Sequence, residues 1–215
     1  MKINTLLTRL LLLFFISVSF FACKEDEIIP EPPDTDDFYF IGTINDKSKN
    51  LISGRNGYRL TVVTQEVNGS SPDVINMVYQ SGLAQLNNNY YIKSSEASNV
   101  IFDNNWFNEA DYQSDPNLYF SNVFSVGSRI FCTLTDSATP CVEIYWKDTY
   151  AKEWTSRRGT QNGSLFNITS VNASTGSSGE NLKMLKATFN CSLYNEMGTS
   201  IVLKNGQLFM IFKRE

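Results

Sequence analysis

The stretch KMLKATFNCSLY, residues 183–194, decides the fold class, because its apolar residues recur at every second position. The apolar set comprises Leu185, Ala187, Phe189, Cys191 and Leu193, and polar residues separate its members. A period of two is typical of a half-buried antiparallel β-strand, whose successive side chains point to opposite faces of the sheet. We therefore predict a strand here, with the apolar set in the core.

The sequence on the C-terminal side of this stretch continues the same pattern. Asn195–Gly198 predicts a turn, and Thr199–Lys204 alternates again through Ile201 and Leu203. Asn205-Gly206 then predicts a turn or a bulge before a further strand. Strand segments are therefore expected at Thr199–Lys204 and at Gln207–Phe212.

Short runs rich in β-branched and aromatic residues, bounded by turn-forming residues, occur through most of the preceding sequence. We predict strands at Phe38–Ile44, Tyr58–Val67, Tyr90–Lys93, Leu118–Val126, Arg129–Thr135, Cys141–Trp146 and Ser164–Val171. Val74–Leu86 is ambiguous and also fits a short helix. Residues 38–215 are therefore expected to form a single all-β domain, an antiparallel β-sandwich or a barrel-like fold.

The N-terminus has the pattern of a secretion signal, which we assign to residues 1–22. Two basic residues, Lys2 and Arg9, precede an apolar run of 13 residues that ends at Ala22. A helix of that length spans roughly 20 Å, which is shorter than the roughly 30 Å core of a bilayer. A cleaved signal is therefore favoured over a retained membrane anchor.

The Ala22-Cys23 junction resembles the lipobox of bacterial lipoproteins, although Phe20 stands where that family usually has Leu. The resemblance implies that the signal is removed before Cys23 and that the Cys23 sulfur carries a diacylglycerol. Several acyl chains would then attach the protein stably to a membrane. Lys24, Glu25 and Asp26, next in the sequence, resemble the export signal of Bacteroidota lipoproteins, which implies a location on the outer face of the outer membrane.

The segment that follows Cys23 predicts a disordered acidic tether, residues 23–37. Residues 24–37 carry seven acidic residues and one basic residue, whereas residues 38–215 carry fifteen of each. Repulsion between like charges, together with Pro30, Pro32 and Pro33, keeps such a segment extended. The balanced charge of the β domain argues against a nucleic-acid partner.

The C-terminal third of the chain, residues 143–213, resembles uncharacterised Bacteroidota lipoproteins with small β domains. The residues that carry this likeness include Trp154-Thr155-Ser156, Phe166-Asn167-Ile168-Thr169, Ala187–Tyr194 and Asn205-Gly206. The resemblance implies a fold and a location, but no activity.

Three cysteines besides Cys23 leave the disulfide pairing open. Cys132 and Cys191 each share a strand face with apolar residues, so their side chains are both expected in the core, and we predict this pair. Pairing of Cys132 with Cys141 would instead close the loop between them. Three reduced thiols are the remaining alternative, since buried cysteine is common in strands.

The absence of histidine excludes the familiar nucleophile triads and the usual catalytic zinc sites. No phosphate-binding glycine-rich loop occurs, so we expect no cofactor. Carboxylates crowd into one segment at Asp103, Glu109, Asp111 and Asp115, without the spacing or the glycine of an EF-hand. We interpret the segment as a surface loop without a metal site, and keep a carboxylate-dependent hydrolase as an alternative function.

Amides next to flat aromatic residues offer a candidate ligand site. Tyr90 and Tyr91 follow three asparagines, and Asn105 precedes Trp106. Sugars are held by aromatic stacking and amide hydrogen bonds, so these four residues are our candidates for binding a glycan. Asp136-Ser137-Ala138 also resembles the O-glycosylation site of Bacteroidota.

These observations predict a non-enzymatic binding or interaction module at the cell surface, anchored through Cys23, with a glycan or a protein as its partner. A lipocalin-like carrier of a small apolar ligand is the main alternative, and it requires a cavity lined by aromatic side chains.

Overall fold

The computed structural model describes residues 37–69, 71, 73–87, 90–91, 96–135 and 139–214, with the backbone alone at 86–87 and 90–91. Cys23, Lys24, Glu25 and Asp26 lie outside the described residues, as do Asp136, Ser137 and Ala138. The predictions made for these residues therefore remain predictions.

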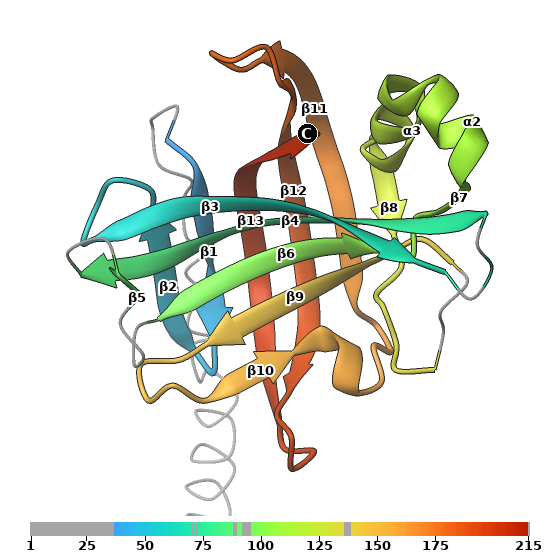
Figure 1. The fold of residues 1–215 in the computed structure, drawn as a ribbon. Coiled ribbons are helices and arrows are strands. Elements are labelled where there is room, and N and C mark those ends of the chain that lie inside the picture. Colours follow the sequence, from blue (N-terminus) through green and yellow to red (C-terminus); the bar gives the residue numbers. More distant parts are fainter. Residues whose placement is uncertain are drawn as a thin grey trace, which may run out of the picture.

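A large antiparallel sheet that curls into a half-barrel forms the domain (Figure 1). Its strands are hydrogen-bonded in the order β2-β1-β13-β12-β10-β9-β6-β4-β3, with β5, β7 and β11 attached to this path and β8 paired to β11. The elements are β1 (Tyr39–Ile44), β2 (Lys47–Ile52), β3 (Tyr58–Asn68), β4 (Val74–Asn87), β5 (Tyr90–Tyr91), β6 (Ala97–Asp103), β7 (Trp106–Asn108), α2 (Glu109–Ser114), α3 (Pro116–Val123), β8 (Gly127–Arg129), β9 (Cys141–Lys147), β10 (Glu153–Thr155), the 3₁₀ turn η2 (Ser156–Arg158), β11 (Leu165–Thr175), β12 (Asn181–Tyr194) and β13 (Ser200–Arg214). The predicted all-β, barrel-like fold is confirmed.

The alternation in residues 183–194 predicts the buried face of β12 correctly. Leu185, Ala187, Phe189, Cys191 and Leu193 are all at most 4% exposed. The Asn205-Gly206 signal is a bulge inside the single strand β13, where the pairing with β12 shifts register. Gly206 lies so close to the Phe189 ring that a Cβ atom would come within 2.5 Å of it, which explains the glycine.

Two predictions along the chain need correction. Leu118–Val126 is not a strand, since residues up to Val123 belong to helix α3. The Asp115 side chain accepts a hydrogen bond from the Leu118 amide at 3.0 Å, and Pro116 occupies the first turn, so this segment carries a helix start. Of Arg129–Thr135, only Arg129 lies in a strand, although Phe131 forms an isolated bridge with Val142.

The structure also decides the secondary structure of two further segments. Val74–Leu86 is strand β4, because it pairs with β3 along its length and with β6 on its other side. The acidic segment predicted as a loop contains β7 and α2, and the Asn108 side chain caps α2 by accepting from the Asp111 amide.

Aromatic side chains fill the concave face of the sheet. Phe102 of β6 lies 5.0 Å from Phe124, 5.3 Å from Phe212 and 6.0 Å from Phe166, measured between ring centroids. Phe124 immediately follows α3, which also contributes Phe120, and both rings contact Tyr79 of β4. Figure 1 shows α2 and α3 above β7 and β8. Around Phe102 the core therefore consists of rings packed against one another.

Polar contacts join parts of the sheet that are distant in strand order. The Thr64 hydroxyl of β3 donates to the Lys213 carbonyl of β13. Glu96, just before β6, accepts from Lys49 of β2 at 2.6 Å and from the Tyr58 hydroxyl of β3 at 2.8 Å. Burial, together with that hydrogen bond, raises the pKa of Tyr58, so the phenol stays protonated. These bonds stabilise the curvature of the sheet.

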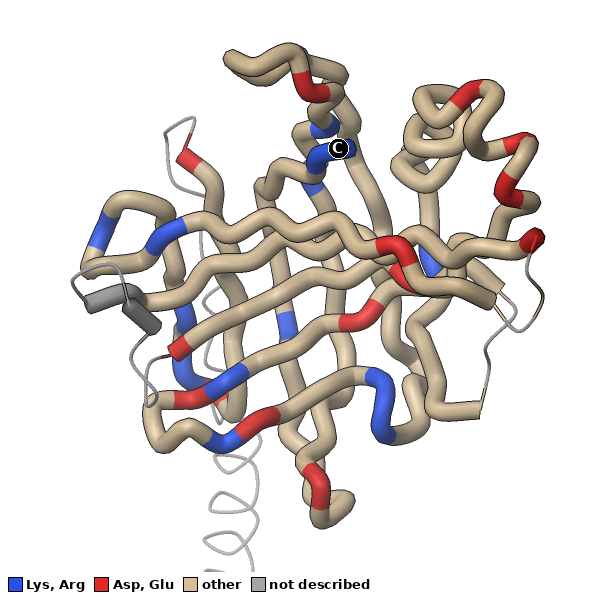
Figure 2. The backbone as a smooth tube through the Cα atoms, in the orientation of Figure 1, with Lys and Arg blue, Asp and Glu red and all other residues tan. Residues whose placement is uncertain are grey.

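Charged residues of both signs are spread over the described part of the domain (Figure 2). No helix in that part is long and apolar enough to cross a membrane.

Candidate binding site

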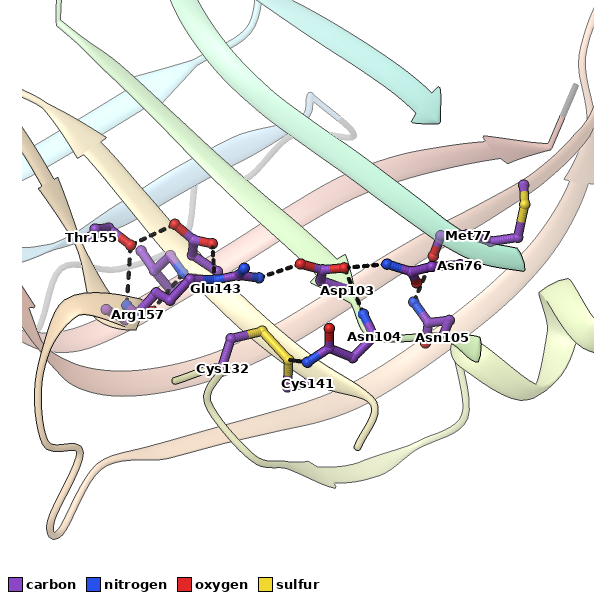
Figure 3. A network of polar contacts seen from close by, with 12 residues as sticks. Asn76, Met77, Asp103, Asn104, Asn105, Cys132, Cys141, Glu143, Thr155 and Arg157 are labelled. Carbon is purple, nitrogen blue, oxygen red and sulfur yellow. Dashed lines mark hydrogen bonds and ion pairs between the residues drawn. A yellow bond between two sulfur atoms is a disulfide. The ribbon is translucent and has the colours of Figure 1, made fainter. Parts of the chain in front are cut away.

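Three polar residues, Asp103, Asn104 and Asn105, lie at the bend where β6 ends and β7 begins (Figure 3). Asn104 has a φ of 57°, a left-handed conformation that asparagine tolerates better than most residues. The Asn105 side chain donates to the Met77 carbonyl at 2.9 Å, and its backbone carbonyl accepts from the Met77 amide at 3.2 Å. The bend is therefore fixed to β4.

Asp103 is the centre of a polar network on the outer face of the sheet (Figure 3). Its carboxylate accepts from the Asn76 side chain at 2.8 Å and from the Asn104 amide at 2.6 Å, and it pairs with Arg157. The Arg157 Nε atom also lies 2.8 Å from a Glu143 oxygen. One guanidinium thus neutralises two carboxylates and joins β6 and β9 to η2.

Burial raises the pKa of the Asp103 carboxyl, but hydrogen bonds from Arg157, Asn76 and Asn104 outweigh it, so this pKa lies below its usual value. Asp103 and Glu143 are therefore both engaged by one arginine.

The other acids of the crowded segment lie at the starts of helices. Glu109 and Asp111 lie in the first turn of α2, and Asp115 caps α3. Within the described residues, no cluster of acids, cysteines or histidines is arranged to hold a metal ion.

Asp103→Asn is expected to make stability less dependent on pH in acid. Because the folded pKa is lowered, the charged carboxylate stabilises the fold above its unfolded pKa of about 3.9, and this contribution is lost as pH falls through the folded value. The variant should lose about 1–3 kcal/mol at pH 7, and the difference from wild type should narrow towards pH 3. Urea unfolding at both pH values measures this, with exposed Asp46→Asn as the control. A difference of equal size at pH 3 and pH 7 would contradict it.

A cleft of about 330 Å³ opens beside the bend. The lining comes from the β6–β7 segment, the start of β9, the end of α3 and the last residue of β8. The lining residues are Phe102, Asn105, Phe107, Asn122, Val123, Ser125, Arg129, Pro140 and Cys141. The cleft thus combines aromatic rings, amides and one guanidinium, the mixture expected of a small-ligand site.

Arg129 is the charged residue of this cleft. Its guanidinium donates to the Ser125 carbonyl at 2.7 Å, the Ser125 hydroxyl at 2.7 Å and the Val123 carbonyl at 3.3 Å. Val123 is the last residue of α3 and Ser125 follows two residues later, so the guanidinium lies at the C-terminal end of this helix, where a positive charge is stabilising. Burial lowers the pKa of Arg129. No carboxylate forms an ion pair with Arg129 among the described residues.

Cys141, which lines the cleft, forms a disulfide with Cys132, and their Cα atoms are 4.9 Å apart. The predicted pair of Cys132 with Cys191 is therefore wrong, and the alternative that closes the loop is correct. The Cys132 amide donates to the Val142 carbonyl, and the Val142 amide donates to the Ile130 carbonyl. These backbone hydrogen bonds bring Cys132 and Cys141 together. Cys191 is a buried free thiol of β12. The side-chain amide of Asn104 donates to the Cys141 sulfur at 3.2 Å, which connects the bend to the disulfide (Figure 3).

The structure divides the four residues predicted to bind a glycan. Tyr90 and Tyr91 pair with Asn87 and Leu86 at one end of β4, whereas Trp106 pairs with Asn76 near the other. Asn87 lies eleven positions after Asn76, which is about 36 Å along a strand. The two pairs therefore do not form one platform, and of the four only Asn105 lines the cleft.

The chain matches no protein-family model, no curated protein and no solved structure.

Proposed function

We propose that this chain is a lipid-anchored envelope protein, resembling the surface lipoproteins of Bacteroidota, whose β domain binds a carboxylate-bearing ligand without catalysing a reaction. The anchor is Cys23, followed by Lys24, Glu25 and Asp26 and by a tether of excess negative charge. The described domain begins directly after that tether and has balanced charge, as expected of a binding module held away from a membrane.

The observation that carries the binding proposal is the Arg129 guanidinium in the cleft. It has no carboxylate partner among the described residues, and guanidinium groups match the planar, two-oxygen geometry of carboxylates. The Asn122 and Ser125 side chains add polar groups, and Phe107 adds a ring. An acidic saccharide, such as a uronic acid, presents the carboxylate, the hydroxyl groups and the apolar ring face that this set would contact.

Two observations favour this role over the alternatives. The rings on the concave face contact one another, as with Phe124 and Phe212 at 4.8 Å, which leaves the carrier function without support. Asp103 and Glu143 share one arginine instead of facing each other across a cleft, which leaves the hydrolase without support.

Palmitate labelling tests the anchor. The wild-type protein, expressed in a bacterium of the Bacteroidota, should incorporate labelled palmitate into its mature form, and Cys23→Ser should not. Protease treatment of intact cells should then degrade the domain, as expected of a surface protein. Equal labelling of both proteins would refute the lipid anchor.

Titration calorimetry with trigalacturonate, against uncharged maltotriose, tests the binding site. Arg129→Met should weaken trigalacturonate binding about 10- to 100-fold, the usual cost of losing a charged hydrogen bond. Asn122→Ala, on the exposed side of α3, removes an amide from the cleft while preserving the cap that Arg129 provides, and should weaken binding severalfold. Arg55→Met, at a distant turn, is the control. Unchanged affinity in both cleft variants, or no binding by wild type, would refute the proposed site.

A further inference from the structure

Strand β1 is buried on both of its faces, although one face of an antiparallel sheet commonly contacts solvent. Phe40 belongs to the main core, so Tyr39 and Ile41, which alternate with it, point to the opposite, convex face. There they form a second apolar cluster with Ile52 of β2, and Phe209 of β13 packs against it. We call these four residues, Tyr39, Ile41, Ile52 and Phe209, the outer cluster. Tyr39, Ile41 and Ile52 are 6%, 0% and 6% exposed.

The neighbouring strands do not account for this burial. Ile41 lies between Asn50 of β2 and Gln207 of β13. Ile101 of β6 is a matched case, because it also points outward and lies between two polar side chains, on β4 and β9. Ile101 stays partly exposed, whereas Ile41 is 0% exposed. Among the described elements, β1 makes extensive contacts with β2 and β13 alone, which indicates that a further segment covers the outer cluster.

The chain that leads into β1 lies on this face. The Phe38 ring is 5.0 Å from the Phe209 ring, and the Asp37 carboxylate pairs with Arg55 at 3.3 Å. The sequence directly before them, IIPEPPDTD at residues 28–36, begins with two isoleucines and lies outside the described residues. Nine extended residues span roughly 30 Å, whereas a strand as long as β1 spans roughly 20 Å. Residues 28–36 are therefore long enough to turn back and cover β1.

The charge of this segment also matches this part of the sheet. The four strands β1, β2, β12 and β13 together contain seven basic residues and no acidic residue. Residues 24–37 contain seven acidic residues and one basic residue. Lys186 borders the outer cluster, since its ammonium group lies 5.1 Å from the centre of the Phe209 ring. Opposite charges attract, so the segment fits the outer cluster in polarity and in charge.

We propose that residues 28–36 fold back over the convex face of β1 and that Ile28 and Ile29 cover the outer cluster. Part of the tether is then bound to the domain, with its acidic residues beside the basic strands. Only residues 24–27 connect Cys23 to the bound segment, which limits their separation to roughly 15–20 Å. Figure 1 shows β1 and β2 on the opposite side of the domain from α3 and β8, so the bound segment leaves the Arg129 cleft open. The inference does not depend on the ligand of that cleft.

Nuclear Overhauser measurements on the full mature chain, with Cys23→Ser and labelled isoleucine methyl groups, test this contact directly. Cross-peaks are expected from the methyl groups of Ile28 or Ile29 to those of Ile41 or Ile52. A sample mixed from two differently labelled copies separates contacts within one chain from contacts between two chains. Absent cross-peaks, or cross-peaks between two copies only, would overturn the inference.

Thermal unfolding of the same chain measures how much the contact stabilises the domain. Ile28→Ser together with Ile29→Ser should lower the melting temperature by about 4–8 °C, because the outer cluster loses its apolar cover. Leu134→Ser is the matched control, since Leu134 is 72% exposed, and it should change the melting temperature by less than about 2 °C. Glu31→Gln together with Asp34→Asn should lower the melting temperature at low salt but not in about 0.5 M NaCl, which screens surface charges. The inference fails if the isoleucine double variant melts as wild type does.

Discussion

Phe102→Ala is expected to lower the free energy of unfolding by about 3–5 kcal/mol, the usual cost of removing a phenyl ring from a packed core. Phe102 is 2% exposed and its ring contacts Phe124, Phe166 and Phe212, which come from three separate parts of the chain. Neighbours held in place by hydrogen-bonded strands cannot collapse fully into the space, so most of the cavity remains.

Urea unfolding followed by tryptophan fluorescence measures this effect. Val126→Ala, at a side chain that is 64% exposed, is the control and should change stability by less than about 0.5 kcal/mol. Phe102→Leu retains much of the volume, and it provides a measurable variant if the alanine protein does not fold. A loss below about 1 kcal/mol for Phe102→Ala would contradict the described core.

Removing the disulfide by Cys132→Ser and Cys141→Ser together is the second large expected effect. The bond closes a loop with a sequence separation of 9, for which chain entropy predicts a loss of about 2–3 kcal/mol. Both sulfurs are buried, because Cys132 is 1% and Cys141 3% exposed, so reductant should act slowly on the native protein. Urea unfolding of the double variant against wild type measures the loss.

Thiol mapping distinguishes this pairing from the alternatives. Alkylation of the denatured, unreduced protein, followed by peptide mass analysis, should label Cys191 and neither Cys132 nor Cys141. A label on Cys141 would indicate the Cys132–Cys191 pair instead, and labels on all three would indicate that no disulfide forms.

The fold was predictable where local alternation coincides with burial. In β12 and β9 every second residue enters the core, and the sequence shows it directly. Strand β2, with the sequence KSKNLI, starts with four polar residues, so it shows no alternation of apolar and polar residues. Residues 118–123 show why composition alone misleads, because their aromatic residues are typical of strands while Asp115-Pro116 starts a helix.

The candidate sites depend on contacts between distant residues, which a single sequence does not reveal. Asn105 was identifiable beside Trp106, but Arg129 reaches the same cleft only because β8 pairs with β11 beyond the disulfide loop. Asn195 was recognised as a turn residue, and that interpretation is correct for its oxygen.

The pairing of β1 with β13 has a consequence for the order in which the domain can fold. Tyr39 lies opposite Phe209, so the first and last strands of the domain are neighbours. Strands β1 and β2 therefore cannot take their place in the sheet until the last residues of the chain have emerged, and pairing over such a sequence distance is slow. In the export proposed above, β1 and β2 would cross the membrane before β13 and would join the sheet only after the last strand had followed them.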